Sequence, residues 1–204
     1  MPAEQPILYT IGHSTHSFDA LLELLRQHGV TAVADVRSHP YSARLGHFNR
    51  EELSSALEAA GIKYVFLGKE LGARRDERDS YSGDRAAYER IAGLPGFAAG
   101  LERLRNGARD YRVALLCAEK EPLDCHRTVL VCRELRDEFE IRHILADGSL
   151  ERHADTERRL VQETGVTRTL FDPPDLTDDD LVQQAYDERA RKIAYRAAQE
   201  EVPQ

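Results

Sequence analysis

The chain has 204 residues, 41% of them hydrophobic and 31% charged, a composition typical of a soluble globular protein with one substantial core. No apolar stretch approaches the roughly 20 residues of a membrane-spanning helix, and Met1–Pro6 is too polar for a secretory signal, so we expect a cytoplasmic protein without a membrane partner. The net charge of −8, from 28 basic and 36 acidic residues, does not indicate nucleic-acid binding, although it is compatible with a local cationic cleft.

Hydrophobic periodicity along the first 148 residues alternates between the patterns of strands and helices. Five apolar runs predict strands, at residues 7–11, 31–36, 62–67, 112–117 and 141–145. Helices are predicted after the capping residue Ser17, after a capping-box variant formed by Asn49 and Glu52, over 88–106 and over 125–139. The polar stretch 68–85 predicts a long surface loop or lid. This alternation predicts an α/β fold, with a mainly parallel, open, Rossmann-like sheet of about five strands and flanking helices.

The sequence pattern changes after Gly148. Residues 150–163 and 181–199 predict two helices, separated by an acidic, proline-containing stretch at 171–180. We therefore expect two parts: an α/β domain at 1–148 that holds the site, and a helical C-terminal extension at 149–204 that packs on it.

Polar side chains gather at the ends of three predicted strands. Residues 12–14 (G-H-S) follow the first strand, 35–37 (D-V-R) the second and 117–119 (C-A-E) the fourth. In open α/β sheets, ligands bind beyond the carboxyl ends of the strands, where the strand order reverses. From these clusters we infer a strand order of 3-2-1-4-5, which would bring all three together, whereas a flavodoxin-like order would partly separate them.

The segment 117–127, C-A-E-K-E-P-L-D-C-H-R, carries the strongest chemical signal. It leaves a buried strand and enters a helix, a place where α/β proteins bind anions and hold reactive groups. Cys125 is the candidate nucleophile, because the helix dipole with His126 and Arg127 favours its thiolate. The alternative is that Cys125 is only a small residue at a helix start. Cys117 points at the same place, and Cys132 is expected in the core.

Four further residues are candidates for acid–base chemistry at this site. His13 and His126 are candidate general acids or bases, since imidazole titrates near neutrality. Asp35 and Glu119 are expected to orient the reacting groups. Together with Cys125 and Cys117, these four form the predicted catalytic set.

Arginine side chains near the strand ends indicate an anionic ligand. Arg37 and Arg127 could together bind a phosphate or carboxylate by charge-assisted hydrogen bonds. The alternative is an internal ion pair of Arg37 with Asp35 or Glu119. The candidate substrate-binding residues are Arg37, Arg127, Ser14, Ser42 and Tyr64.

Two other chemistries would use the same thiols. A disulfide between Cys117 and Cys125 is sterically conceivable, so a redox pair stays open, although the spacing is not that of CxxC oxidoreductases. A set of His13, Cys117, Cys125 and His126 would suit zinc or iron. Because its spacing matches no common zinc motif, we assign no residue as a metal ligand, and the cofactor stays unknown.

Four motifs run through the chain: T-I-G-H-S at 10–14, D-V-R-x-x-P-x-S at 35–42, G-I-x-Y-x-x-L-G-x-x-L-G at 61–72 and C-A-E-K-x-P-x-x-C-H-R at 117–127. Together they resemble domain-of-unknown-function family 488 (DUF488), as do His143 and the segment 185–196. The resemblance implies an α/β sheet with the motif residues at one end, and it implies no activity. The chain departs from the family at Ala73-Arg74, where another glycine is common, which leaves the path of that loop open.

We therefore predict an enzyme with a cysteine-centred site, a transferase or hydrolase, for a small anionic substrate that could be a nucleotide or nucleic-acid fragment. The competing hypothesis is a non-catalytic ligand sensor or nucleic-acid-associated factor that uses the same pocket. A thiol at Cys125 with a lowered pKa distinguishes the two, because a sensor has no need of one.

Overall fold

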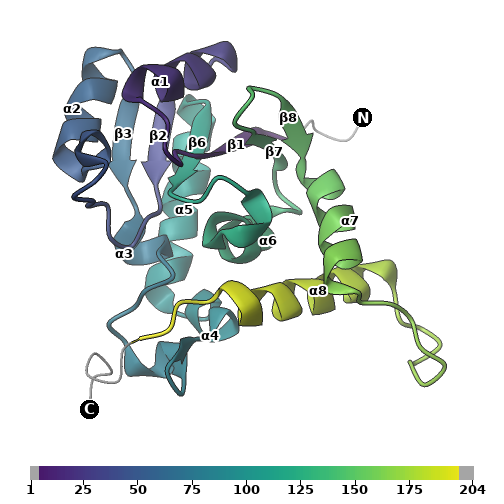
Figure 1. The fold of residues 1–204 in the computed structure, drawn as a ribbon. Helices are drawn as coiled ribbons and strands as arrows, with labels where there is room; N and C mark the ends of the chain where they lie inside the picture. The colour runs from purple at the N-terminus through teal and green to yellow at the C-terminus, as the bar shows by residue number, and fades with distance from the viewer. Residues whose placement is uncertain (1–4, 198–204) are drawn as a thin grey trace.

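The computed structural model describes residues 5–197, so Met1–Glu4 of the polar N-terminal segment and the last two residues of the helix expected at 181–199 lie outside it. Its centre is a six-stranded sheet with the order β3-β2-β6-β1-β7-β8 (Figure 1). The strands are β1 (Ile7–Gly12), β2 (Ala32–Asp35), β3 (Lys63–Phe66), β6 (Val113–Cys117), β7 (Glu140–Ile144) and β8 (Leu150–Arg152). All pairings are parallel except that of β7 with β8. The expected α/β fold with a mainly parallel sheet is confirmed.

The order of the two central strands differs from the expected one. β6 lies between β2 and β1, whereas the sequence placed the first strand next to the second. The predicted order was therefore wrong, because it exchanged β1 and β6. The carboxyl ends of β2, β6 and β1 are still neighbours, and the strand that ends at Cys117 lies in the middle.

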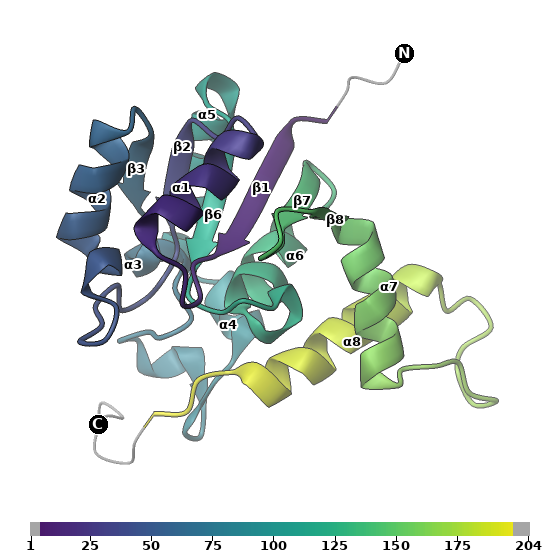
Figure 2. The same cartoon turned by 45° about the horizontal axis from the view of Figure 1, so that its top comes forward.

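Helices cover both faces of the sheet (Figures 1 and 2). The helices α1 (Phe18–Gln27) and α2 (Arg50–Ala59) pack on one face, and α5 (Pro95–Asp110) packs on the other. Ser17 caps α1 as predicted by accepting a hydrogen bond from Ala20 N at 3.2 Å. The predicted capping box of α2 is wrong, because the Asn49 side chain accepts from Ser42 N instead.

Side chains along β6 point alternately to the two faces of the sheet, and this determines which face the Cys117 thiol lies on. Ala114 and Leu116 pack with α1 and α2, while Leu115 and Cys117 pack on the α5 side. The helix expected over 125–139 begins on that side as a 3₁₀ turn (Pro122–Asp124), continues as a π-helical segment (Arg127–Cys132) and ends as the short α6 (Arg133–Leu135). Cys132 is fully buried there, as expected of a core residue.

The stretch 68–85 is not the surface loop that its polar composition predicted. It contains α3 (Gly68–Leu71), a 3₁₀ turn (Arg78–Ser80) and the hairpin of β4 (Tyr81–Ser82) and β5 (Arg85–Ala86), and α4 (Tyr88–Ala92) follows. Leu71 and Ser80 are completely buried. A few apolar anchors therefore fix this segment against the α5 side of the sheet.

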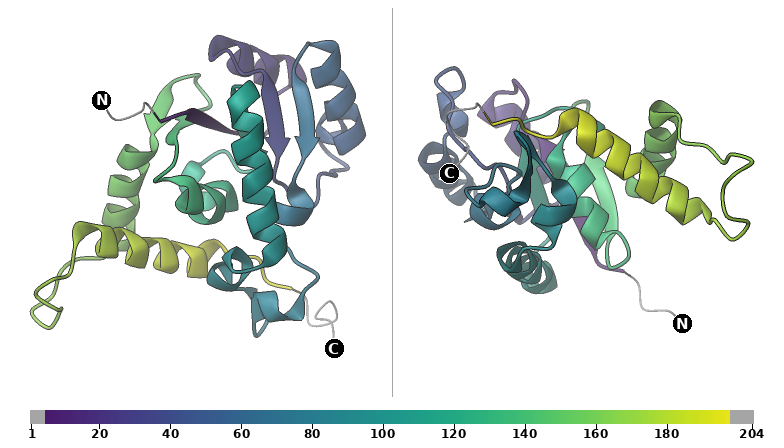
Figure 3. Two further views of the ribbon diagram at one scale, coloured as in Figure 1. Left: turned by 180° about the vertical axis from the view of Figure 1, so that it is seen from behind. Right: turned by 90° about the horizontal axis from the view of Figure 1, so that it is seen from below.

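The C-terminal part adds one strand and two helices to the structure (Figure 3). Residues 150–152, expected to start a helix, form β8, and α7 (His153–Thr164) and α8 (Asp178–Ile193) follow. The backbone then runs antiparallel to β5, with Ala86 N donating to Tyr195 O and Ala197 N to Asp84 O. The division of the chain at residue 148 stays a prediction. Between residues 5 and 197, no helix combines the length and apolar character needed to cross a membrane.

Candidate functional site

Four side chains from the segment after β6 converge at the carboxyl edge of the sheet. The sulfur atoms of Cys117 and Cys125 each lie 3.0 Å from Oε2 of Glu119. Nδ1 of His126 lies 3.6 Å from the Cys117 sulfur. The four potential ligand atoms are all within 4.8 Å of one another. Both thiols are buried, His126 is half-buried and Glu119 is exposed, so this compact group, which we call the thiol cluster, reaches the surface at Glu119.

A backbone carbonyl of β2 fixes the orientation of the His126 ring. Nε2 of His126 lies 2.9 Å from the oxygen of Val36. Because a carbonyl can only accept, Nε2 carries a proton and Nδ1 faces the thiol cluster, where the neutral ring would present a lone pair to a metal ion. Metal-binding histidines are usually oriented in this manner. Without a metal, burial lowers the pKa of His126, but contact with the Cys125 thiolate outweighs burial and raises it.

Arg127 and the close approach of Gly12 fix the backbone of the loop between Cys117 and Cys125. Arg127, which is fully buried, donates from Nη1 to Glu119 O at 2.6 Å and from Nη2 to Lys120 O at 3.2 Å. On the other side, a Cβ at Gly12 would lie only 1.9 Å from Glu119 O, so the loop requires glycine there. Arg127 therefore holds the loop that positions the thiols, and its guanidinium does not face an open cavity.

A second polar group lies beside the thiol cluster, at the end of β2. Arg37 donates from Nε and Nη2 to the Asp35 carboxylate at 2.9 and 2.6 Å, and Tyr64 donates to the same carboxylate at 2.8 Å. The internal ion pair left open by the sequence therefore exists. Nη1 of Arg37 lies 3.2 Å from Nε2 of His13. Burial and the Arg37 charge lower the pKa of His13 to about 4, so His13 is neutral at pH 7 and accepts this hydrogen bond.

A cavity of about 360 Å³ adjoins the thiol cluster and is lined by Cys117, Glu119 and His126. Arg37 and Arg74 supply positive charge to its walls, and the Arg74 guanidinium stacks 4.3 Å from the ring of Tyr195. Tyr88 of α4 also lines it. No pattern in the sequence singled out Arg74, Tyr88 or Tyr195. Arg74 comes from the stretch that was predicted as a loop, Tyr88 from α4, and Tyr195 from the segment after α8.

Seven predicted site residues do not line this cavity: Cys125, Arg127, Asp35, Tyr64, His13, Ser14 and Ser42. The first five belong to the contacts described above, and the two serines have other partners. Ser14 continues the backbone ladder of β1 by donating to Ala118 O at 2.9 Å. The Ser42 hydroxyl accepts from the backbone of Arg44 and Leu45 and so stabilises a local turn. Their catalytic or substrate-binding roles stay predictions without geometric support.

The charges around the two thiols act in opposite directions. Burial disfavours the Cys125 thiolate, but the Cys117 thiol and the Arg127 guanidinium outweigh it and lower the pKa of Cys125 well below its ordinary value. Burial raises the pKa of Cys117. Burial and the charge on Cys125 together raise the pKa of Glu119. A thiolate and a carboxylate 3.0 Å apart repel each other, so the charge on Cys125 disfavours ionisation of Glu119.

The sequence model of the family described as "Domain of unknown function DUF488" matches residues 17–133, more than half of the chain. The matched range contains the complete loop from Cys117 to Arg127. The chain belongs to this family. No curated protein and no solved structure matches it. The resemblance inferred from the motifs is thus confirmed, and the DUF488 description assigns no activity.

In this DUF488 protein, a chain of buried hydrogen bonds leads away from Arg127 through residues outside the matched range. Nε of Arg127 donates to Thr10 Oγ1 at 3.3 Å, and Thr10 Oγ1 lies 2.8 Å from Nδ1 of His143. Nε2 of His143 lies 3.0 Å from Nδ1 of His153 in α7. Thr10 and His143 are register partners of β1 and β7 and are completely buried.

The buried hydrogen-bond chain ends at a carboxylate. Nε2 of His153 lies 2.8 Å from the hydroxyl of Tyr186 in α8, which donates to Oε1 of Glu157 at 3.0 Å. Because the Tyr186 proton goes to Glu157, His153 must donate from Nε2 and accept at Nδ1, and the same holds for His143. Every hydrogen bond therefore points the same way, from the Arg127 cation to the Glu157 anion.

Proposed function

We propose that Cys117, Cys125 and His126 of this DUF488 protein bind a divalent transition-metal ion, with Glu119 as the fourth group. The observation that supports this most is the closeness of the four ligand atoms, all within 4.8 Å, together with the oriented Nδ1 of His126. Thiolate and imidazole ligands favour zinc, with iron as the other first-row candidate. The sequence ranked a nucleophilic cysteine above metal coordination, and these positions favour the reverse.

The cavity beside the thiol cluster supports a catalytic role for such a centre. Sites with two cysteines and one histidine occur in zinc enzymes, where the remaining position takes water or substrate. If Glu119 leaves the fourth position to water, its carboxylate lines the cavity beside that position and is placed to carry a proton to or from the water. Arg37 and Arg74 would hold an anionic substrate, which makes metal-assisted hydrolysis or group transfer on a phosphate- or carboxylate-bearing molecule the favoured chemistry.

The experiment is a metal analysis of the full chain, purified anaerobically under reducing conditions. We expect about one zinc or iron per chain in the wild type. Cys125→Ala and His126→Ala should be purified with much less metal, because each removes one ligand and so weakens binding. Cys132→Ala is the matched control, since Cys132 is equally buried but lies outside the thiol cluster. The proposal fails if the wild type neither contains nor takes up zinc or iron, or if Cys132→Ala loses metal to the same extent.

A second candidate is catalysis by the Cys125 thiolate without a metal, and the lowered pKa of that thiol favours it. Alkylation of the chelator-treated protein tests this candidate over a range of pH. A metal-free nucleophile predicts that Cys125 reacts with an apparent pKa well below the free value of about 8.5 and that added zinc has no effect. Protection of Cys125 by zinc would instead support the metal centre.

A further inference from the structure

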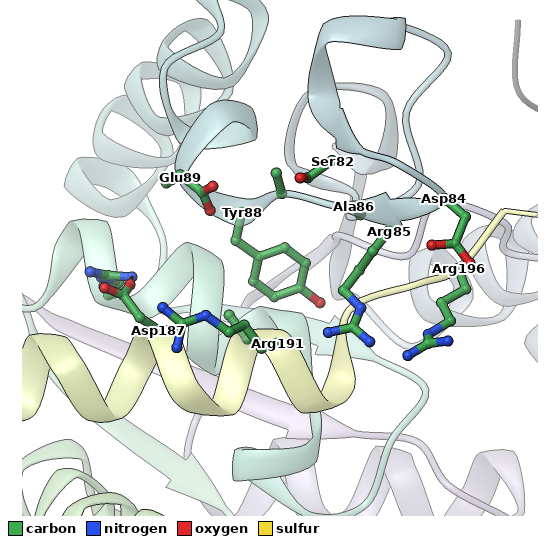
Figure 4. Close-up of a pocket in the computed structure, with 12 residues that line it drawn as sticks. Ser82, Asp84, Arg85, Ala86, Tyr88, Glu89, Asp187, Arg191 and Arg196 are labelled. Atoms are coloured by element: carbon green, nitrogen blue, oxygen red, sulfur yellow. Dashed lines mark hydrogen bonds and ion pairs between the residues drawn. The ribbon is translucent and has the colours of Figure 1, made fainter. Parts of the chain in front are cut away.

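A second cavity, of about 570 Å³, lies away from the thiol cluster (Figure 4). It is enclosed by the β4–β5 hairpin, the start of α4 and α8. Tyr88 lines both this cavity and the one beside the thiol cluster. Its volume falls within the range of small-molecule sites, roughly 300 to 1,000 Å³.

Two arginines are held opposite each other at one end of this cavity. Arg85 of β5 and Arg196 form an antiparallel β-bridge, whose register is fixed by the backbone hydrogen bonds of Ala86 and Ala197. Like charges directly opposite each other in an antiparallel pair are destabilising. Within residues 5–197, neither guanidinium forms an ion pair or hydrogen bond, although the chain has more acidic than basic residues. The two positive charges therefore lie side by side without an ion-pair partner among the described residues, although Asp84 lines the same end of the cavity.

The rest of the cavity shows what kind of ligand would fit. Arg191 lines the cavity from α8 but forms an ion pair with Glu188, and the charge of Arg133 is taken up by Asp187 at 2.7 Å. The Ser82 and Tyr88 side chains supply hydroxyl groups to its walls. Glu89 lies at the opposite end from the arginine pair in Figure 4 and would repel a second negative group.

We propose that Arg85 and Arg196 form a binding site for the phosphate group of a small phosphorylated molecule. Guanidinium groups match phosphate oxygens in pairs of parallel hydrogen bonds, and the bound charge relieves the repulsion across the β-bridge. The part of the ligand that extends toward Glu89 is uncharged or cationic. This site is separate from the metal centre and does not depend on it.

Calorimetric titration of the full chain at low ionic strength tests the site, with inorganic phosphate and ribose 5-phosphate as probes. We expect saturable binding of at least one probe to the wild type. Arg196→Gln and Arg85→Gln should weaken it about tenfold, because each removes a charge-assisted contact. Arg109→Gln, on an exposed arginine of α5, is the matched control and should bind like the wild type.

Thermal unfolding supplies a second, independent measurement. Without phosphate, Arg196→Gln should melt at the wild-type temperature or above it, because the like-charge contact is gone. Added phosphate should raise the melting temperature of the wild type more than that of Arg196→Gln. The proposal is overturned if neither probe binds, if Arg196→Gln binds as tightly as the wild type, if Arg109→Gln is weakened equally, or if Arg196→Gln melts lower without phosphate. Metal content should be unchanged in all three variants, which separates a failure here from a failure of the metal centre.

Discussion

Glu119 is the residue on which the thiol cluster depends most closely. One carboxylate oxygen contacts both sulfur atoms, and the backbone carbonyl of the same residue accepts from Arg127. The side chain thus contacts the thiols, while the hydrogen bond from Arg127 holds the main chain. With a metal bound, this carboxylate either completes the coordination or stays beside it as a proton carrier.

Glu119→Gln should weaken zinc binding without abolishing it. The amide keeps the size of the side chain but removes its charge, so three ligands remain, and we expect the affinity to fall by about 10- to 100-fold. A competition titration with a chromophoric chelator measures this. Glu52→Gln, on the exposed side of α2, serves as the control. An unchanged affinity in Glu119→Gln would show that the carboxylate has no part in the metal site.

Sequence reasoning found the thiol cluster because its members lie within eleven consecutive positions, so local spacing alone brings them together. It could not find Arg74, Tyr88 and Tyr195, which reach the cavity only through tertiary packing. It also grouped Ser14 and Ser42 with the site. Neighbouring strand ends determine which segments meet, but not which way each side chain points.

At the level of elements, the buried hydrogen-bond chain connects α7 and α8 to the segment after β6. His153 and Glu157 come from α7 and Tyr186 from α8, while Arg127 holds the loop of the thiol cluster. Buried polar groups are costly unless their hydrogen bonds are satisfied. The C-terminal helices therefore orient Arg127 as well as covering apolar surface.

Tyr186→Phe tests this connection with little change in volume. Removing the hydroxyl leaves His153 Nε2 and Glu157 without this partner, so we expect a loss of about 1–3 kcal/mol in the free energy of unfolding. In ¹⁵N NMR spectra, His143 and His153 should show fixed Nε2–H tautomers in the wild type and lose them in the variant. Tyr111→Phe, at a half-exposed tyrosine, is the control. Identical histidine spectra in both variants would refute the directional chain.

The failures at this level share a physical cause. Periodicity could not predict the exchange of β6 and β1, because it identifies strands but not the neighbours with which each strand pairs. β8 was mistaken for a helix start, since three residues are too few to show alternation. Residues 68–85 were judged a loop from composition, yet single anchors such as Leu71 fix them. The long apolar runs and the cap at Ser17 were predicted correctly.

For the molecule as a whole, buried neutral histidines set a dependence of stability on pH. Burial lowers the pKa of His153 to about 4 and that of His143 well below its ordinary value. The unfolded chain binds these protons near pH 6.5, so below that pH it holds more protons than the folded state. Their contribution to stability is thus complete above pH 6.5 and is lost as the pH falls toward 4.

We expect His153 alone to lower the free energy of unfolding by about 3 kcal/mol between pH 6.5 and 4. Urea denaturation at a series of pH values measures this slope. His153→Gln should flatten the profile in that interval, while His47→Gln, an exposed histidine, should leave it as in the wild type. Equal slopes in all three proteins would mean that folding does not lower the pKa of His153.

X-ray absorption at the metal edge of the zinc-loaded protein tests most directly whether the thiol cluster holds a metal ion. We predict a first shell with two sulfur atoms at about 2.3 Å and nitrogen or oxygen atoms at about 2.0–2.2 Å. In Cys132→Ala the same shell should be found, and in Cys125→Ala one sulfur should be missing. A first shell of nitrogen and oxygen alone would contradict the proposed centre.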